Sequence, residues 1–265
     1  MMEEARSMGV EVACDQYPYN AGSTLLSALA PPKFLADGLE ELSLKLKGAE
    51  FRKRVVQAIE MDSGGDWENF IKSTGFENIM ISSSPSRPEY IGSSIARIAE
   101  AEKKNTYDVF FDLLMADKAG ALVILFVMGD EDIHRIMQSP LTMIGTDGIP
   151  ATGSSKVHPR MTGTYPRILG RYVRENNVLS LEEAVRKMTS FPAQTFRMKR
   201  KGLLVEGFDA DLIIFDPETI IDRSTYEEPD NKPEGIRFVL VNGHISLEDG
   251  VLTGAASGKV LRRGE

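Results

Sequence analysis

The chain has 265 residues, of which 42% are hydrophobic and 26% charged, and its formal net charge at pH 7 is −8. These values are typical of a soluble globular protein and allow one large domain or two ordinary ones. The acidic balance argues against nucleic acid or an anionic membrane surface as the main partner.

The sequence also argues against a membrane span, a signal peptide and cysteine-based sites. The longest apolar stretch, near Ala119–Met128, is too short to cross a bilayer. The N-terminus is acidic and lacks the basic segment and apolar run of a signal peptide, so we expect a cytoplasmic protein. Cys14 is the single cysteine, which excludes an internal disulfide and a thiolate metal cluster.

The first third of the chain begins with a helix over Glu3–Met8, ended by Gly9, and a buried strand over Val10–Tyr17, ended by Pro18. A chain that opens in this way is expected to be truncated. The less regular segment that follows predicts helices over Phe51–Glu60 and Ile91–Lys104 and a short strand over Asn78–Ser82. This segment is typical of an insertion between core elements, such as a lid.

The middle of the chain alternates between helices and strands. Helices are predicted over Tyr107–Lys118 and Asp130–Gln138, and buried strands over Ala121–Met128 and Leu141–Gly145. This alternation favours a parallel sheet or a β/α barrel. A loop rich in Gly, Ser and Pro follows at Asp147–Gly163.

The last third contains two predicted helices, Tyr165–Asn176 and Ser180–Thr189, the second with the capping pattern S-x-x-E. From Gly202 onward the pattern changes to short strands, and we place a domain boundary at about residue 200. The predicted strands, with Asn242-Gly243 as a hairpin turn, are Asp211–Phe215, Phe238–Val241 and His244–Leu247.

Asp147 is the leading candidate for chemistry. It ends the apolar strand MIGTDG, and the C-terminal ends of strands carry the active site in β/α folds. A carboxylate there can bind a metal or move a proton. The alternative is an aspartate that only caps the following loop.

Tyr17, Tyr19 and Ser23 form a second cluster, in DQYPYNAGST. A phenol and a hydroxyl at a strand end can hydrogen-bond a substrate carboxylate. The alternative is a tyrosine packed in the core with its hydroxyl as a polar end.

Histidine is scarce, and His158, in KVHPR, is the one of three that lies where chemistry is plausible. No pair of histidines has metal-ligand spacing, so the chain by itself does not predict a four-ligand zinc site. Arg160, Arg167 and Arg171 are close to the same loop and either bind a carboxylate or form structural ion pairs.

Three stretches together resemble the N-acyl-D-amino-acid deacylase (D-aminoacylase) branch of the amidohydrolase superfamily. They extend over nearly the whole chain and read ACDQYPYNAGSTLLSALAPP, then MIGTDGIP with VHPRMTGTYPRILGRYVRE, then KGLLVEGFDADLIIFDP with EGIRFVLVNGHISLEDGVLTG. The third is shared by many amidohydrolases, whereas the first two are particular to this branch.

The resemblance implies an α/β fold: part of a (β/α)8 barrel over residues 1–200, with a lid insertion at about 20–106, and part of a small β-sandwich over 201–265. On that template Val10–Tyr17, Ala121–Met128 and Leu141–Thr146 are the sixth, seventh and eighth barrel strands.

The resemblance also implies site roles. Asp147 matches an aspartate that takes a proton from metal-bound water, delivers it to the leaving nitrogen and can be a weak metal ligand. Tyr17 and Ser23 match positions that hold the substrate carboxylate, and His158 and Arg160 match a recurring H-P-R loop near the substrate.

The family's other zinc ligands have no counterpart here, and Cys14 does not match its cysteine ligand. The sequence therefore predicts the C-terminal portion of a zinc-dependent deacylase, inactive by itself and without tight zinc binding. It would need a separately encoded N-terminal half or self-association. The alternatives are another amidohydrolase, such as a dihydroorotase- or hydantoinase-like cyclic amidase, and a non-catalytic fragment.

Overall fold

The computed structural model describes residues 1–62, 67–117, 120–150 and 155–262. The chain divides into two compact units, each discontinuous in sequence. Unit 1 comprises Met1–Pro18, Asp130–Gly148 and Pro159–Glu265, and unit 2 comprises Tyr19–Gly129 and Ile149–His158. The predicted end of one helix at Lys118 and residues 151–154 of the predicted loop lie outside the described residues.

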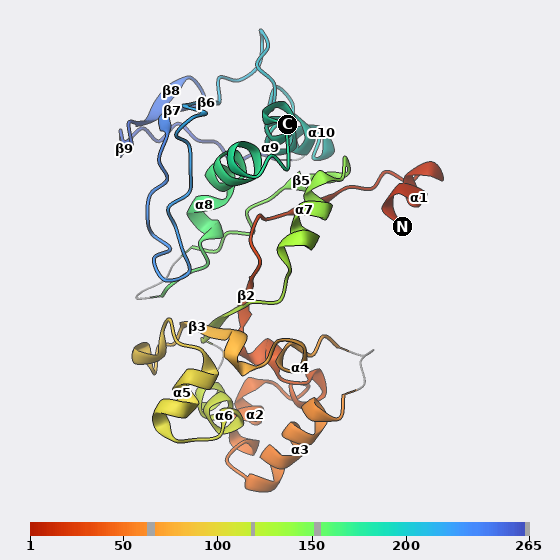
Figure 1. Ribbon diagram of the computed structural model, residues 1–265, viewed down its shortest axis with the longest axis vertical. Coiled ribbons are helices and arrows are strands. Elements are labelled where there is room, and N and C mark those ends of the chain that lie inside the picture. The colour runs from red at the N-terminus through yellow and green to blue at the C-terminus, as the bar shows by residue number, and fades with distance from the viewer. Residues whose placement is uncertain (63–66, 118–119, 151–154, 263–265) are drawn as a thin grey trace. The chain divides into compact units, whose positions relative to one another are not determined.

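Unit 1 contains a parallel pair of strands, β1 (Cys14–Gln16) and β5 (Thr142–Ile144), in which Cys14 is opposite Thr142. Helix α7 (Asp130–Gln138) directly precedes β5 and packs against it. These elements form a β-α-β arrangement with Tyr19–Gly129 inserted between β1 and α7 (Figure 1). The parallel pairing brings the C-terminal ends of both strands to one edge.

The assignment of Ala121–Met128 to a barrel strand between these two is wrong. The run forms β4 (Leu122–Leu125) in unit 2, in the middle of an antiparallel sheet with β2 (Gly22–Leu25) and β3 (Ile79–Ser83). β1 and β5 instead pair directly with each other. A short apolar run is typical of any buried strand and determines neither its direction nor its partner.

The helices of unit 1 confirm the predicted helical segments. Helix α8 (Arg160–Arg167) continues into a π-helical segment, η5 (Ile168–Glu175), and is followed by α9 (Leu181–Met188) and α10 (Ser190–Thr195). The core of the unit packs α7, β5, η5 and α9 together, through residues that include Ile133, Met137, Ile144, Ile168, Leu169, Tyr172 and Ala184. A short helix, α1 (Met2–Ser7), begins the chain.

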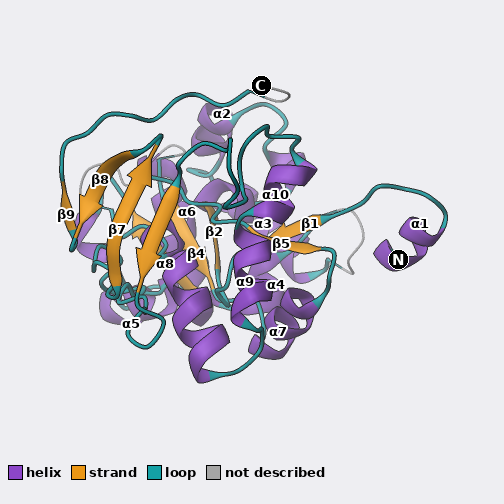
Figure 2. Cartoon of the chain, turned by 90° about the horizontal axis from the view of Figure 1, so that it is seen from above, coloured by secondary structure: helices purple, strands orange, loops and turns teal. Residues whose placement is uncertain are grey.

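The C-terminal part of unit 1 is an antiparallel sheet in the order β6-β7-β8-β9 (Figure 2). The hairpin turn is confirmed, because Asn242 and Gly243 both have positive φ, as a tight two-residue turn requires. The strands are β6 (Leu212–Phe215), β7 (Ile236–Val241), β8 (His244–Glu248) and β9 (Val251–Leu252).

Unit 2 packs helices and short 3-10 turns around its three-stranded sheet. The predicted helices in this segment and the short strand near Asn78 are confirmed. The helices are α2 (Leu39–Lys45), α3 (Ala49–Glu60), α4 (Phe70–Thr74), α5 (Ile95–Glu102) and α6 (Thr106–Asp117). The 3-10 turns are η1 (Leu26–Leu29), η2 (Pro32–Phe34), η3 (Phe76–Asn78) and η4 (Pro88–Tyr90).

The mixture of helices and strands agrees with the predicted α/β class. The partial barrel, the lid role of 20–106 and the domain boundary near residue 200 stay predictions. Within the described part of the chain, no helix has the length and apolar character needed to span a bilayer.

Candidate functional site

Two of the predicted site residues follow the parallel strands of unit 1. Tyr17 comes directly after β1, and Asp147 lies three residues beyond the end of β5. Since both strands end at the same edge, both residues lie at the edge where β/α folds carry their active sites. Asp147 adopts a left-handed backbone conformation with φ 45°, which aspartate tolerates better than most residues.

Arg160 joins these two residues. It is the first residue of α8, and its side chain is only 2% exposed. Its Nη2 lies 2.7 Å from Oδ2 of Asp147, and its guanidinium carbon lies 4.6 Å from the centroid of the Tyr17 ring. Three of the five predicted site residues therefore form one cluster in unit 1.

The cluster contains a buried cation, a half-buried phenol and an accessible carboxylate. Burial raises the pKa of Tyr17; the Arg160 charge opposes that shift and the Asp147 charge adds to it. Tyr17 therefore stays protonated at neutral pH and can donate a hydrogen bond. The Asp147 side chain is 65% exposed, so its carboxylate can reach a ligand in solvent while it is paired with Arg160.

The other two predicted residues, Ser23 and His158, belong to unit 2. Ser23 lies in β2, opposite Ile124 of β4, and is half-buried. His158 is buried; its Nε2 lies 2.8 Å from the carbonyl oxygen of Ala21, and its ring meets the Tyr19 ring edge-on at 5.1 Å. His158 thus fixes the segment that leads into Ser23.

Arg167 and Arg171 form structural ion pairs, one of the two roles left open for them. Arg167 Nη1 and Arg171 Nε lie 2.9 and 3.0 Å from the two carboxylate oxygens of Asp222, whose side chain is fully buried. Sequence reasoning missed Asp222, for which the only signal was its place directly after the apolar pair Ile220-Ile221. It also missed Tyr226, which is half-buried and interacts electrostatically with Tyr17. The pKa of Tyr226 is raised, mainly by burial.

The donors present do not make a zinc site. Within the described ranges no group of three or more His, Cys, Asp and Glu side chains could hold a metal ion. A protein zinc site needs at least three such ligands, and Asp147 would supply one oxygen. The described residues do not fit the implied metal by themselves.

Comparison with known proteins gives one matching family model and several relatives. The model, described as "Amidohydrolase family", matches residues 92–246. A D-aminoacylase from Alcaligenes xylosoxydans xylosoxydans is 40% identical over 176 residues, which are 66% of this chain and 35% of that protein. An N-acyl-D-glutamate deacylase from the same organism is 34% identical over 242 residues, 91% of this chain and 40% of that protein.

A solved structure is similar as well. It is N-acyl-D-glutamate deacylase from Bordetella bronchiseptica, complexed with zinc and a phosphonate inhibitor that mimics the tetrahedral intermediate. It matches with a TM-score of 0.70 and 32% identity over 94% of this chain and 43% of that chain. The chain thus spans less than half the length of each of these relatives.

Proposed function

The chain belongs to the amidohydrolase family, and from this premise we propose that it is the C-terminal portion of a metal-dependent enzyme that hydrolyses the amide bond of N-acyl-D-amino acids. The names of the relatives support this substrate class. The observation that carries the proposal is the cluster in which buried Arg160 contacts both Asp147 and Tyr17.

Asp147 is proposed as the group that moves the proton. Amide hydrolysis forms a bond from a water oxygen to the acyl carbon and breaks the bond from that carbon to nitrogen. The water must lose a proton, and the leaving nitrogen must gain one. An accessible carboxylate at the C-terminal edge of the strands can accept the first proton and deliver the second.

Tyr17 and Ser23 are proposed to hold the free carboxylate of the substrate, because a phenol and a hydroxyl can each donate a hydrogen bond to it. Arg160 is buried and already paired, which favours a role in positioning Asp147 and Tyr17. His158 is proposed to position the segment that carries Ser23, through its contact with Ala21.

We propose that the missing zinc ligands lie in the part of the relatives that this chain does not span. A polypeptide carrying that part would then be the partner, whereas a second copy of this chain would repeat the same residues and add none of those ligands. In the absence of such ligands, nothing in the cluster activates the attacking water strongly enough for amide hydrolysis. The isolated chain is therefore expected to be inactive.

The test measures release of free amino acid in the presence of zinc. The substrates are N-acetyl-D-leucine and N-acetyl-D-glutamate, with their L-enantiomers and dihydroorotate as a cyclic amide. The 265-residue chain is assayed alone and mixed with the N-terminal portion of the Alcaligenes D-aminoacylase. We expect D-selective turnover only in the mixture.

In that mixture Asp147→Asn should lower kcat by between about a hundredfold and ten-thousandfold, the usual contribution of a general acid–base group. Asp249→Asn is the matched control, because Asp249 is exposed in a surface ion pair with Arg237. Turnover by the unmixed 265-residue chain would refute the prediction that it is inactive. Hydrolysis of dihydroorotate and of none of the N-acetyl amino acids would favour the cyclic amidase. An unaffected Asp147→Asn variant would remove Asp147 from the mechanism.

A further inference from the structure

Unit 2 contains a cleft whose lining shares no residue with the cluster around Asp147. Its volume is about 880 Å³, within the range of small-molecule sites. One wall is helix α3, which contributes Phe51, Arg54 and Ala58 at helical spacing. The opposite wall comes from residues 31–37 and the end of α2, and Trp67 also lines the cleft.

An aromatic pair flanked by two cations forms part of this cleft. The rings of Phe34 and Phe51 meet edge-on, with centroids 5.5 Å apart. Lys33 Nζ lies 5.3 Å from the Phe34 centroid, and the Arg54 guanidinium carbon lies 5.4 Å from the Phe51 centroid. Two positive charges therefore lie against one apolar surface.

The cations of the lining differ in whether an acid holds them. Lys45 is held by Asp37 at 2.8 Å and Glu41 at 3.4 Å. Lys33 and Arg54, by contrast, make no salt bridge to any residue that the structure describes, and Asp62 is the one further acid in the lining. The two cations that lie against the aromatic pair are therefore available to an anion.

We infer that this cleft binds an organic carboxylate with an apolar acyl or aryl group. The apolar part would pack on Phe34, Phe51 and Trp67, and the carboxylate would pair with Lys33 and Arg54. Free carboxylic acids and N-acyl amino acids share this chemistry. The inference does not depend on the proposed deacylase activity.

Trp67 makes the site directly observable, because it is the single tryptophan of the chain. The fluorescence of Trp67 in the full 265-residue chain is titrated with phenylacetate and, separately, with N-acetyl-D-phenylalanine. We expect a saturable change with at least one of them. Acetate, which lacks the apolar group, and phenylacetamide, which lacks the charge, should give no saturable change at the same concentrations.

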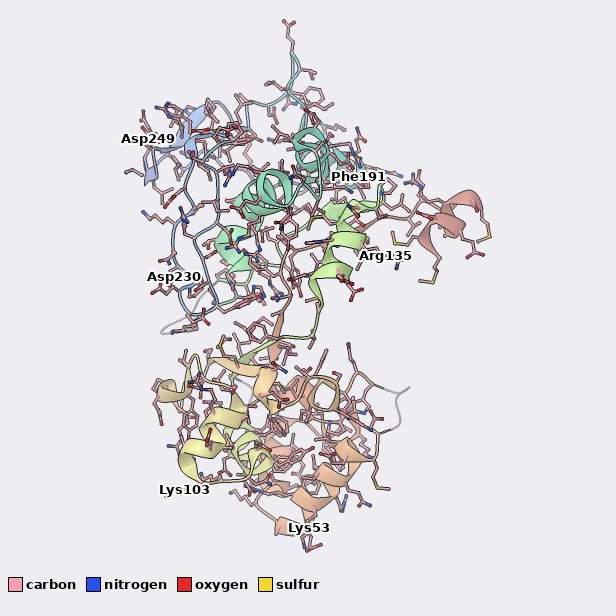
Figure 3. The ribbon with its side chains drawn as sticks, viewed as in Figure 1. Lys53, Lys103, Arg135, Phe191, Asp230 and Asp249 are labelled. Atoms are coloured by element: carbon pink, nitrogen blue, oxygen red, sulfur yellow. The ribbon has the colours of Figure 1, made fainter. Side chains whose placement is uncertain are left out.

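Two variants test the cations against a control on the same helix. Lys33→Ala and Arg54→Ala should each weaken binding about fivefold, since a solvent-exposed charge pair contributes modestly. Lys53→Ala should leave binding unchanged, because Lys53 is 73% exposed, pairs with Glu50 and is not part of the lining (Figure 3). Circular dichroism checks that all three variants are folded.

Three outcomes would overturn the inference. They are no saturable change with either carboxylate, equal affinity for phenylacetamide, and equal weakening by the Lys53→Ala variant. None of these measurements requires turnover, so failure here leaves the proposed function untouched, and failure of the deacylase assay leaves this site untouched.

Discussion

Asp222 is a fully buried charge of unit 1, and its two arginines, Arg167 and Arg171, come from the end of α8 and from the π-helical segment η5 that continues it. The Asp222 side chain is 0% exposed, whereas Arg167 and Arg171 are 19% and 39% exposed. A buried carboxylate is tolerated only when it is paired, and removing one partner of such a group leaves the other charges uncompensated.

We therefore predict that Asp222→Asn lowers the free energy of unfolding by about 2–4 kcal/mol, towards the lower end of the cost of breaking a buried pair, because the arginines keep some contact with water. Denaturant titration followed by circular dichroism measures this. Asp230→Asn is the control, since Asp230 is exposed in the same segment (Figure 3), and should change stability by less than about 0.5 kcal/mol. Equal stability of the two variants would mean that the ion pairs contribute nothing.

Arg160 shows a different use of a buried charge. Its cation contacts the Tyr17 ring and an aspartate that is mostly in solvent, so part of its partner remains available for chemistry. An arginine can do this because its planar guanidinium stacks on an aromatic face and still donates hydrogen bonds from its edge. Lysine would not reproduce this geometry.

The long helix of unit 1 changes character in its middle. Pro166 lies near the end of α8 and cannot donate the hydrogen bond that a regular helix needs there. The chain continues as the π-helical segment η5, and this widened form places Gly170 against the segment that carries Ile220 and Ile221. A Cβ atom on Gly170 would lie 2.6 Å from the carbonyl oxygen of Ile220.

Gly170→Ala should therefore destabilise the protein by about 1–3 kcal/mol, although alanine usually stabilises a helix relative to glycine, because the backbone that it meets cannot yield as a side chain could. Thermal unfolding followed by circular dichroism tests this. Gly258→Ala provides the comparison, because a Cβ there meets nothing within 4 Å. A Gly170→Ala variant as stable as Gly258→Ala would show that the helix shifts without cost.

At the scale of the whole molecule, unit 1 leaves apolar sheet surface in solvent. Ile213 and Ile214 are successive residues of β6 and so face opposite sides of the sheet, yet they are 50% and 49% exposed. Both faces of β6 are therefore partly exposed at these two positions, although Phe215 of β6 and Ile236 of β7 pack against the core of the unit. Strands β1 and β5 pair only with each other among the described residues, so no further strand covers either outer edge there, although Lys187 Nζ donates to the Thr142 carbonyl oxygen of β5.

Such surfaces are rare on a soluble monomer, and we predict that the purified chain is not a clean, stable monomer. Sedimentation velocity over a range of concentrations should show concentration-dependent association. The N-terminal portion of a relative should suppress this association if it covers the same surfaces. A single monomeric species at all concentrations would contradict the need for a partner.

The local features of this protein were determined by the sequence itself. The S-x-x-E pattern predicted the start of α9, where Ser180 Oγ accepts the backbone N–H of Glu183, and Asn242-Gly243 predicted the hairpin. These signals involve residues a few positions apart, so the backbone preferences of the chain suffice. The motifs that resemble the deacylases likewise named Tyr17, Asp147 and Arg160 without a structure.

The tertiary structure decided which distant segments meet. It placed Leu122–Leu125 in an antiparallel sheet of unit 2 and paired β1 directly with β5. It also brought Arg160 into contact with Asp147 and Tyr17. An apolar run can be buried beside any of several partner strands. The sequence also does not distinguish a charged side chain that is solvated from one that is paired. Apart from the Arg160–Asp147 pair, these choices depend on packing between residues about a hundred or more positions apart, which local periodicity does not encode.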